Sequence, residues 1–315
     1  MELDNTHQIS QEQLQNQHFD VFIAVSGYES RCTFLASKLN ISEIPVKTVL
    51  AFDEMKGSFS RAENDRKFTE WGFTFHEGSS MESSPVDILL NHICIKSKNK
   101  HLDILVDYSS MPKIWYNAII NFFIAYEDKL YHVNLWFSYS PSEYFKAQKN
   151  AVYKSFDSFP HKLNSDRPVA LIVGLGYEKS RSGELSKQIN AKVTFAFFAD
   201  PAYDDRFVKE VLENNQLILD HMNGDQIIRY PIFDLNSINS SLTKLCVNLR
   251  TSYQLILAPI GPKPFTLMCF LMAARYPDMK IWKVVTTGQS EAGDRKAMGE
   301  LLIYKIMFTS EEVDY

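Results

Sequence analysis

Cysteine is scarce in this chain, and the few cysteines do not cluster. The 315 residues include 4 cysteines, Cys32, Cys94, Cys246 and Cys269, and no Cys-x-x-Cys pair. This spacing argues against a disulfide scaffold and against a structural zinc site, and it fits a reducing compartment. The histidines show no ligand spacing such as His-x-His either, so we expect no metal site.

Long apolar runs and an excess of basic residues are also missing. The richest apolar run, residues 119–126, is far shorter than the roughly 18 residues of a membrane span. The first 18 residues are polar and rich in glutamine, without the apolar core of a signal peptide. The net charge of -5 argues against an extensive surface for duplex nucleic acid. We therefore expect a cytoplasmic protein with no membrane partner.

Common catalytic and cofactor motifs are absent from the sequence as well. It contains no Gly-x-Ser-x-Gly elbow, no Walker loop and no kinase motif set. Gly174-Leu-Gly176 begins like a dinucleotide fingerprint, but Lys179 stands where the third glycine is needed. We therefore expect no bound cofactor, and NAD binding has little support.

What the sequence does contain is an internal resemblance between its two halves. Residues 19–31 (FDVFIAVSGYESR) resemble residues 168–181 (PVALIVGLGYEKSR), and residues 102–113 resemble residues 253–263. Five such correspondences occur in the same order, 147 to 151 positions apart; Gly27 and Gly176, for example, are 149 apart. Such an ordered set is hard to obtain by chance, so we infer a tandem duplication. The spacing is too long for a solenoid repeat, so each copy should be a domain or half-domain. The expected organisation is a polar N-terminal segment (1–18), a first unit (19–157) and a second unit (168–315).

Short apolar runs alternate with longer segments of helical pattern in both halves. The predicted strands are residues 21–25, 48–52, 73–76, 103–107 and 134–139, then 170–173, 193–198, 227–230, 255–259 and 280–285. The predicted helices are residues 29–39, 61–71, 86–97 and 111–126, then 178–189, 204–214, 238–249 and 263–275. The runs 151–156 and 301–308 would each add an antiparallel edge strand. Strands that are apolar throughout favour parallel sheets covered by helices on both faces. We therefore predict an α/β fold: two tandem Rossmann-like units with mostly parallel sheets, related by internal duplication.

Polar residues follow several of these predicted strands, at the edge where open α/β sheets bind ligands. A glycine turn before a helix offers backbone N–H groups to an anion, an acid can accept hydrogen bonds from ribose, and serine and lysine suit phosphate. The candidate ligand-binding residues of the first half are Ser26, Gly27, Tyr28, Glu29, Arg31, Asp53, Asp107, Ser109, Ser110 and Lys113. Those of the second half are Gly174, Gly176, Tyr177, Glu178, Arg181, Asp200, Gly261 and Lys263.

Each of these signals also fits an ordinary structural role. The Gly-Tyr-Glu turns can be plain strand-to-helix connections, with the glutamate near the positive end of the helix dipole. Asp107 can serve as a helix cap, and Pro112 and Pro262 suit a first helical turn with or without a ligand. The recurrence of the turns at one topological position favours a functional role.

The turns after the fourth strands resemble those of a known family. Asp107-Tyr-Ser-Ser-Met-Pro-Lys113 and Pro259-Ile-Gly-Pro-Lys263 resemble the fourth-strand motif of CRISPR-associated Rossmann fold (CARF) domains. Two such units in one chain look like a CARF pseudo-dimer or a fused pair of SAVED domains. The resemblance implies a cyclic oligonucleotide ligand. Its contacts would come from Asp107, Ser109, Ser110, Lys113, Gly261 and Lys263, and from the turns 26–31 and 174–181.

Three functional hypotheses follow. The first is a sensor of a nucleotide messenger, of the cyclic oligonucleotide kind, in bacterial antiviral defence, which signals through a separate effector protein. The second is a nucleotide-processing enzyme, such as a ring-nuclease-like phosphodiesterase, with Glu29 and Glu178 as candidate acid–base residues. The third is a scaffold subunit of a defence complex that binds no ligand. The sequence favours the sensor over the enzyme.

Overall fold

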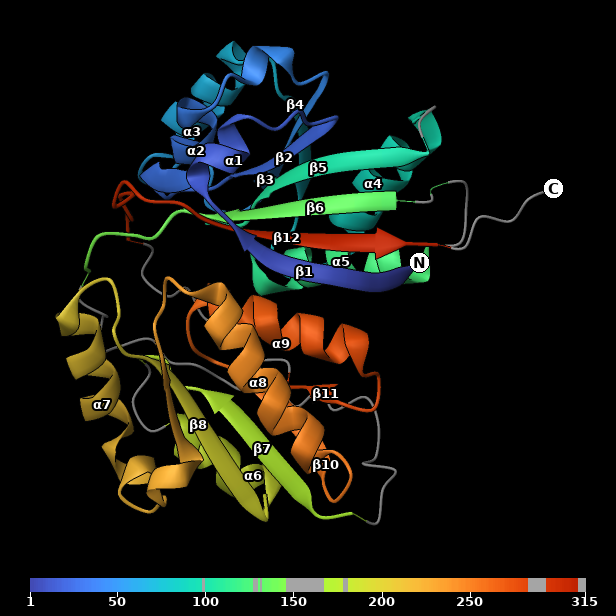
Figure 1. The fold of residues 1–315 in the computed structure, drawn as a ribbon. Helices are drawn as coiled ribbons and strands as arrows, with labels where there is room; N and C mark the ends of the chain where they lie inside the picture. The colour runs from blue at the N-terminus through green and yellow to red at the C-terminus, as the bar shows by residue number, and fades with distance from the viewer. Residues whose placement is uncertain are drawn as a thin grey trace. The chain divides into compact units, whose positions relative to one another are not determined.

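The computed structural model describes residues 1–97, 100–126, 130, 132–145, 167–177, 181–282 and 293–310, except the side chains of Lys96 and Arg181. The chain forms two compact units, each with its own sheet (Figure 1). The first unit joins Met1–Phe145 to Ala292–Tyr315, and the second is Lys146–Glu291. No helix within the described ranges is both long and apolar enough to cross a membrane.

The first unit is built on a seven-stranded sheet in the order β1-β12-β6-β5-β2-β3-β4. The strands are β1 (Glu2–Ile9), β2 (Val21–Ser26), β3 (Val46–Phe52), β4 (Thr74–Gly78), β5 (His101–Asp107), β6 (His132–Tyr139) and β12 (Leu302–Thr309). The five strands from β6 to β4 in this order are parallel, whereas β12 runs antiparallel to both β6 and β1.

Helices cover both faces of this sheet (Figure 1). They are α1 (Gln11–Gln15), α2 (Phe34–Lys38), α3 (Arg61–Glu70), α4 (Ser84–Lys96) and α5 (Lys113–Ala125), with two 3₁₀ turns at Ser30–Thr33 and Ile41–Glu43. Leu14 of α1, Leu35 of α2 and Phe68 of α3 share one core cluster with alternate strand residues such as Phe22 and Ala24. The other side chains of β2, Ile23 and Val25, are buried too, as expected for a strand with helices on both faces.

The second unit contains a five-stranded parallel sheet in the order β11-β10-β7-β8-β9. Its strands are β7 (Val169–Gly174), β8 (Val193–Ala199), β9 (Ile227–Tyr230), β10 (Gln254–Pro259) and β11 (Lys280–Ile281). Its helices are α6 (Arg181–Ile189), α7 (Asp205–Leu219), α8 (Leu235–Leu249) and α9 (Lys263–Arg275), with a 3₁₀ turn at Gly224–Gln226. Leu185 of α6 and Val211 of α7 pack on one face of the sheet, and Phe265 of α9 packs against Phe197 of β8.

The two units share one strand order. Reading β6-β5-β2-β3-β4 against β11-β10-β7-β8-β9 matches strand for strand in chain order. The register also agrees, since Val21 pairs with Val46 in the first unit and Ala170 with Val193 in the second. In each sheet the chain first adds two strands on one side of the first parallel strand, β3 and β4 beside β2 or β8 and β9 beside β7. It then crosses to β5 or β10 on the other side. The boundary between β2 and β5, and that between β7 and β10, is the topological switch point, where open α/β sheets bind ligands.

The predicted α/β fold with mostly parallel sheets is confirmed, whereas the predicted unit boundaries need correction. The run 301–308 was expected to extend the second unit (168–315), yet β12 lies between β1 and β6 of the first sheet. Pairing there completes the hydrogen bonds at the edge of β6 and buries Ile303 and Ile306. The polar segment 1–18 contributes β1 and α1 to the same unit. The other predicted edge strand, 151–156, and residues 283–285 lie outside the described residues.

Ile303→Ala tests the place of β12 in the first core. Ile303 is fully buried in the cluster that includes Phe22 and Trp136. We expect the free energy of unfolding of the first unit to fall by about 2–5 kcal/mol, the usual cost of such a truncation in a core. Denaturant unfolding followed by tryptophan fluorescence measures it, since Trp71, Trp115 and Trp136 all lie in this unit.

Thr309→Ala, at the end of the same strand, serves as the control and should cost less than about 1 kcal/mol. An equally small loss for Ile303→Ala would contradict the assignment of β12 to this core.

Candidate functional site

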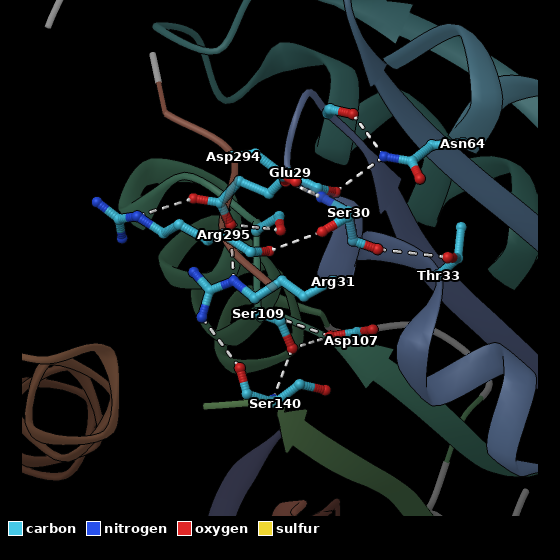
Figure 2. A network of polar contacts seen from close by, with 12 residues as sticks. Glu29, Ser30, Arg31, Thr33, Asn64, Asp107, Ser109, Ser140, Asp294 and Arg295 are labelled. Atoms are coloured by element: carbon cyan, nitrogen blue, oxygen red, sulfur yellow. Dashed lines mark hydrogen bonds and ion pairs between the residues drawn. The ribbon is translucent and has the colours of Figure 1, made fainter. Parts of the chain in front are cut away.

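The predicted site residues of the first unit come together at the switch point of its sheet. Parallel strands end at one edge, so the turn after β2 (residues 26–31) meets the turn after β5 (residues 107–110) and the end of β6 at Ser140. Figure 2 shows the polar contacts that join these turns. These contacts join groups of the protein to one another.

The turn after β2 is held in place by its glycine and by a side chain from α3. A Cβ atom at Gly27 would lie 2.8 Å from the ring of Phe52, so no larger residue fits there without a shift. The buried amide of Asn64 donates hydrogen bonds to the carbonyl oxygens of Gly27 (2.9 Å) and Glu29 (2.8 Å). These bonds satisfy backbone acceptors in a turn that has no strand partner, and they fix the path of residues 27–29.

Glu29 lies at the centre of the network, where it accepts hydrogen bonds from two side chains and forms an ion pair with a third. Its Oε2 accepts from Nε of Arg31 (2.7 Å) and from Oγ of Ser110 (2.8 Å), and its Oε1 lies 3.3 Å from Nε of Arg295. A catalytic role for Glu29 would require it to give up these partners.

Arg31 is almost completely buried, with a side-chain exposure of 1%. Its Nη1 donates to the carbonyl oxygen of Ser140 (3.0 Å), and its guanidinium lies 5.6 Å from the ring centroid of Tyr139. Burial opposes the charge, but the carboxylate of Glu29 and the hydroxyl of Tyr139 outweigh it and raise the pKa of Arg31. The guanidinium that was predicted to meet a ligand therefore binds the protein's own groups.

The serines after β5 are also engaged. Oδ1 of Asp107 accepts from the backbone N–H (3.0 Å) and the hydroxyl of Ser109. The Ser109 hydroxyl in turn accepts from the backbone N–H of Ser140 (2.7 Å). Ser109 is fully buried, so these bonds join the end of β5 to that of β6. Ser110 is half-buried and bonds to Glu29.

Ser26, the last residue of β2, donates to Oδ1 of Asp65 on α3. The same carboxylate accepts from Nε of Arg61 (2.9 Å), and Nη1 of Arg61 donates to the carbonyl oxygen of Phe52 (2.7 Å). Arg61 and Asp65 were missed, although an i,i+4 pair of opposite charge on a predicted helix was visible in the sequence. Ser26 thus helps to anchor α3 to the ends of β2 and β3.

The segment that precedes β12, residues 293–298 (the C-terminal segment), adds two residues that were not predicted from the sequence. Oδ1 of Asp294 accepts from the backbone N–H of Ser30 (2.6 Å), and the carbonyl oxygen of Arg295 accepts from the backbone N–H of Arg31 (3.1 Å). These residues are far from the turn in sequence, and no motif linked them to it.

Tyr28, Asp53 and Lys113 lie nearer to solvent. Tyr28 is half-buried, 6.4 Å between ring centroids from Phe59, whose exposure is 61%. Burial and then the Glu29 carboxylate raise the pKa of Tyr28. Asp53 is exposed, and slight desolvation and then the neighbouring Glu54 raise its pKa. Lys113 is half-buried and begins α5.

In the second unit, the predicted glycines allow two turns to pack closely. A Cβ atom would lie 2.5 Å from the ring of Phe265 at Gly174, and 2.8 Å from the carbonyl oxygen of Leu175 at Gly261. At Gly176 it would lie 3.0 Å from the carbonyl oxygen of Ile260. These glycines therefore let the two turns pack against each other and against Phe265.

An asparagine pair holds the turn after β7 as Asn64 holds the turn after β2. Nδ2 of Asn215 donates to the carbonyl oxygen of Gly176 (2.8 Å), and Nδ2 of Asn214 donates to that of Tyr177 (2.7 Å). Asn64 and Asn214 are 150 positions apart, within the range of the repeat. The repeat spacing was therefore the signal that could have identified these residues.

The other predicted residues of the second unit lie on several elements. Tyr177 packs against Phe207 at 5.4 Å between ring centroids, and Oδ2 of Asp200 pairs with Nη1 of Arg229 at 3.0 Å. Lys263 is half-buried and begins α9. Glu178 and the side chain of Arg181 lie outside the described residues.

The described residues contain no group of three or more His, Cys, Asp or Glu side chains placed to hold a metal ion. No protein-family model matches the sequence, and no curated protein matches it significantly.

Asn64→Asp tests whether the amide of Asn64 fixes the turn after β2. The substitution keeps the size of the side chain. It replaces the NH2 group, which donates to two carbonyl oxygens, with a carboxylate oxygen that can only accept. We expect a loss of about 1–3 kcal/mol in the free energy of unfolding, the cost of unsatisfied buried groups. Asn40→Asp, which changes an exposed asparagine bonded to Glu43, is the matched control in the same denaturant titration. Equal stability of the two variants would remove Asn64 from this role.

Cys32 should resist alkylation in the folded protein. Burial and then the nearby Glu29 carboxylate raise the pKa of its thiol to about 12. Because the thiolate is the reactive form, almost none is present at pH 8. All four cysteines are buried, so iodoacetamide should modify them only after unfolding in guanidinium, as peptide mass spectrometry would detect. Fast modification of Cys32 without denaturant would be inconsistent with its burial.

Proposed function

We propose that the chain is a sensor that binds a nucleotide messenger of the cyclic oligonucleotide class at the switch points of its units and signals to a separate effector protein. The observation that carries the proposal is the recurrence of one arrangement. In each unit a Gly-Tyr turn, held by an asparagine from the helix that follows the next strand (α3 or α7), stands beside a second turn that ends in Pro-Lys. Switch points are where such folds bind nucleotides.

We propose further that the two units arose by duplication of one module. Their shared strand order and strand register support this origin. A duplicated module suits a ligand with repeated chemical units, because each copy can recognise one repeat.

The helices at the switch points suit a phosphate. α5 and α9 are 13 residues long, begin at Lys113 and Lys263, and have prolines as N-cap residues, which give no side-chain hydrogen bond. In the second unit, by contrast, Asp204 and Asp234 cap α7 and α8 with their carboxylates. The positive helix end and the lysine together favour an anion at each switch point.

Aromatic and acidic residues of the first unit suit a nucleoside. Tyr28 and the exposed Phe59 offer ring surface for stacking a base, and the exposed Asp53 offers oxygens to ribose hydroxyls. Phe59 also has a positive φ of 43°, a conformation that bulky residues rarely adopt outside functional or strained sites.

The double variant Lys113→Ala, Lys263→Ala should lose at least about tenfold in affinity, because it removes a charge-assisted contact from each unit. Titration calorimetry with cyclic di-, tri-, tetra- and hexanucleotides measures it. Lys47→Ala, Lys192→Ala is the matched control, since Lys47 lies in the first residues of β3 and Lys192 directly precedes β8, at the opposite edges of the two sheets. Equal affinity of the two double variants would remove Lys113 and Lys263 from the site.

The fate of the nucleotide separates the proposed sensor from the other two hypotheses. Each nucleotide is incubated with the full chain and recovered by chromatography. Intact bound ligand supports the sensor. Shortened product would overturn the sensor in favour of the nucleotide-processing enzyme. If none of the nucleotides binds, the scaffold hypothesis is the one that stands.

A further inference from the structure

Arg295 differs from the other partners of Glu29 in its access to solvent. Its side chain is 39% exposed, against 1% for Arg31. Its contact with Glu29 (3.3 Å) is also longer than the Arg31 contact (2.7 Å). Arg31 is further fixed by its bond to the carbonyl oxygen of Ser140. An anion arriving from solvent can therefore exchange with Glu29 at Arg295 while the Arg31 pair remains in place.

The backbone around Arg295 fastens the segment on which it lies to the turn after β2. Its carbonyl oxygen accepts from the backbone N–H of Arg31 (3.1 Å) and from the hydroxyl of Ser30 (3.3 Å), as Figure 2 shows. Asp294 adds a bond to the backbone N–H of Ser30 (2.6 Å). A shift of Arg295 thus disturbs the turn and the C-terminal segment together.

The same segment runs beside the residues that follow β6. The guanidinium of Arg295 lies 4.1 Å from the ring centroid of Phe145, and the backbone N–H of Glu143 donates to the carbonyl oxygen of Lys296 (3.0 Å). The backbone N–H of Met298 donates to the carbonyl oxygen of Pro141 (2.9 Å). The chain leaves the first unit after Phe145 and returns to it at Ala292, so both connections to the second unit begin at this pair of segments.

We propose that Arg295 is a ligand-responsive switch residue. A phosphate of the ligand replaces the Glu29 carboxylate as the partner of its guanidinium, and this exchange loosens the contact between residues 29–31 and 294–296. The loosening passes to residues 141–145 and 293–298, the two ends of the connections to the second unit. This inference rests on the proposed function, which it extends by naming the residue that couples binding to the signal.

The first test compares nucleotide affinities of full-length variants by titration calorimetry with the same cyclic nucleotides. Arg295→Ala should lose at least about tenfold in affinity, because it removes a charge-assisted contact, and Arg295→Lys should retain part of it. Arg66→Ala is the matched control, since Arg66 is an exposed arginine paired with Glu70 on α3. If the unchanged protein binds and Arg295→Ala binds equally well, this inference is overturned and the proposed function stands. If the unchanged protein binds none of the nucleotides, both are overturned.

The second test measures hydrogen–deuterium exchange of residues 141–145 and 293–298. Arg295→Ala removes the contact with Glu29 and leaves the buried Arg31–Glu29 pair in place, so it should raise exchange in both segments at least threefold without ligand. Nucleotide should do the same to the unchanged protein and add little to the variant. Exchange that stays at the level of the unchanged protein in Arg295→Ala, or that nucleotide fails to raise in the unchanged protein, would overturn the coupling.

Discussion

Arg31 carries its charge where water does not reach it, and the switch point of the first unit is arranged around this fact. Burying a charge costs several kcal/mol unless it is paired and its hydrogen bonds are satisfied. Glu29 provides the opposite charge, and the carbonyl oxygen of Ser140 accepts a second hydrogen bond from the guanidinium. Satisfying Glu29 then requires Ser110 and Arg295. One buried ion pair thereby joins the ends of three strands to the C-terminal segment.

The parallel part of the fold could be predicted because burial on both faces leaves a clear pattern in the sequence. Every residue of β2 is buried, as are five of the seven residues of β5, and strands buried on both faces are mostly apolar. β1 could not be predicted, since an edge strand with five exposed or half-buried polar positions in succession, Asp4 to Gln8, has no such pattern. β12 was recognised as a strand, but apolar side chains do not encode which strand edge they will pair with.

At the candidate site, the sequence identified positions more reliably than it identified contacts. Glu29 of the turn after β2 does meet Ser110 of the turn after β5, because the ends of parallel strands share an edge, and Asp107 bonds to Ser109. The sequence did not reveal that these groups bind one another, since glutamate and arginine two residues apart can equally face a ligand. Asn64 was missed although its counterpart Asn214 lies at the repeat spacing. Arg295 was missed because its partners are distant in the chain, and no repeat or motif marks it; its contacts depend on the path of the backbone, which is set by tertiary packing.

The placement of β12 has a consequence for how the protein folds while it is synthesised on the ribosome. Residues up to Phe145 emerge first, yet their sheet lacks the strand between β1 and β6 until residues 302–309 have been made. The backbone groups of β1 and β6 that face β12 therefore stay unpaired while the whole second unit is synthesised. Such open strand edges are prone to pair with the wrong partner. The second unit, which is continuous in sequence, can fold during this interval. Completion of the first unit therefore comes after the synthesis of the second.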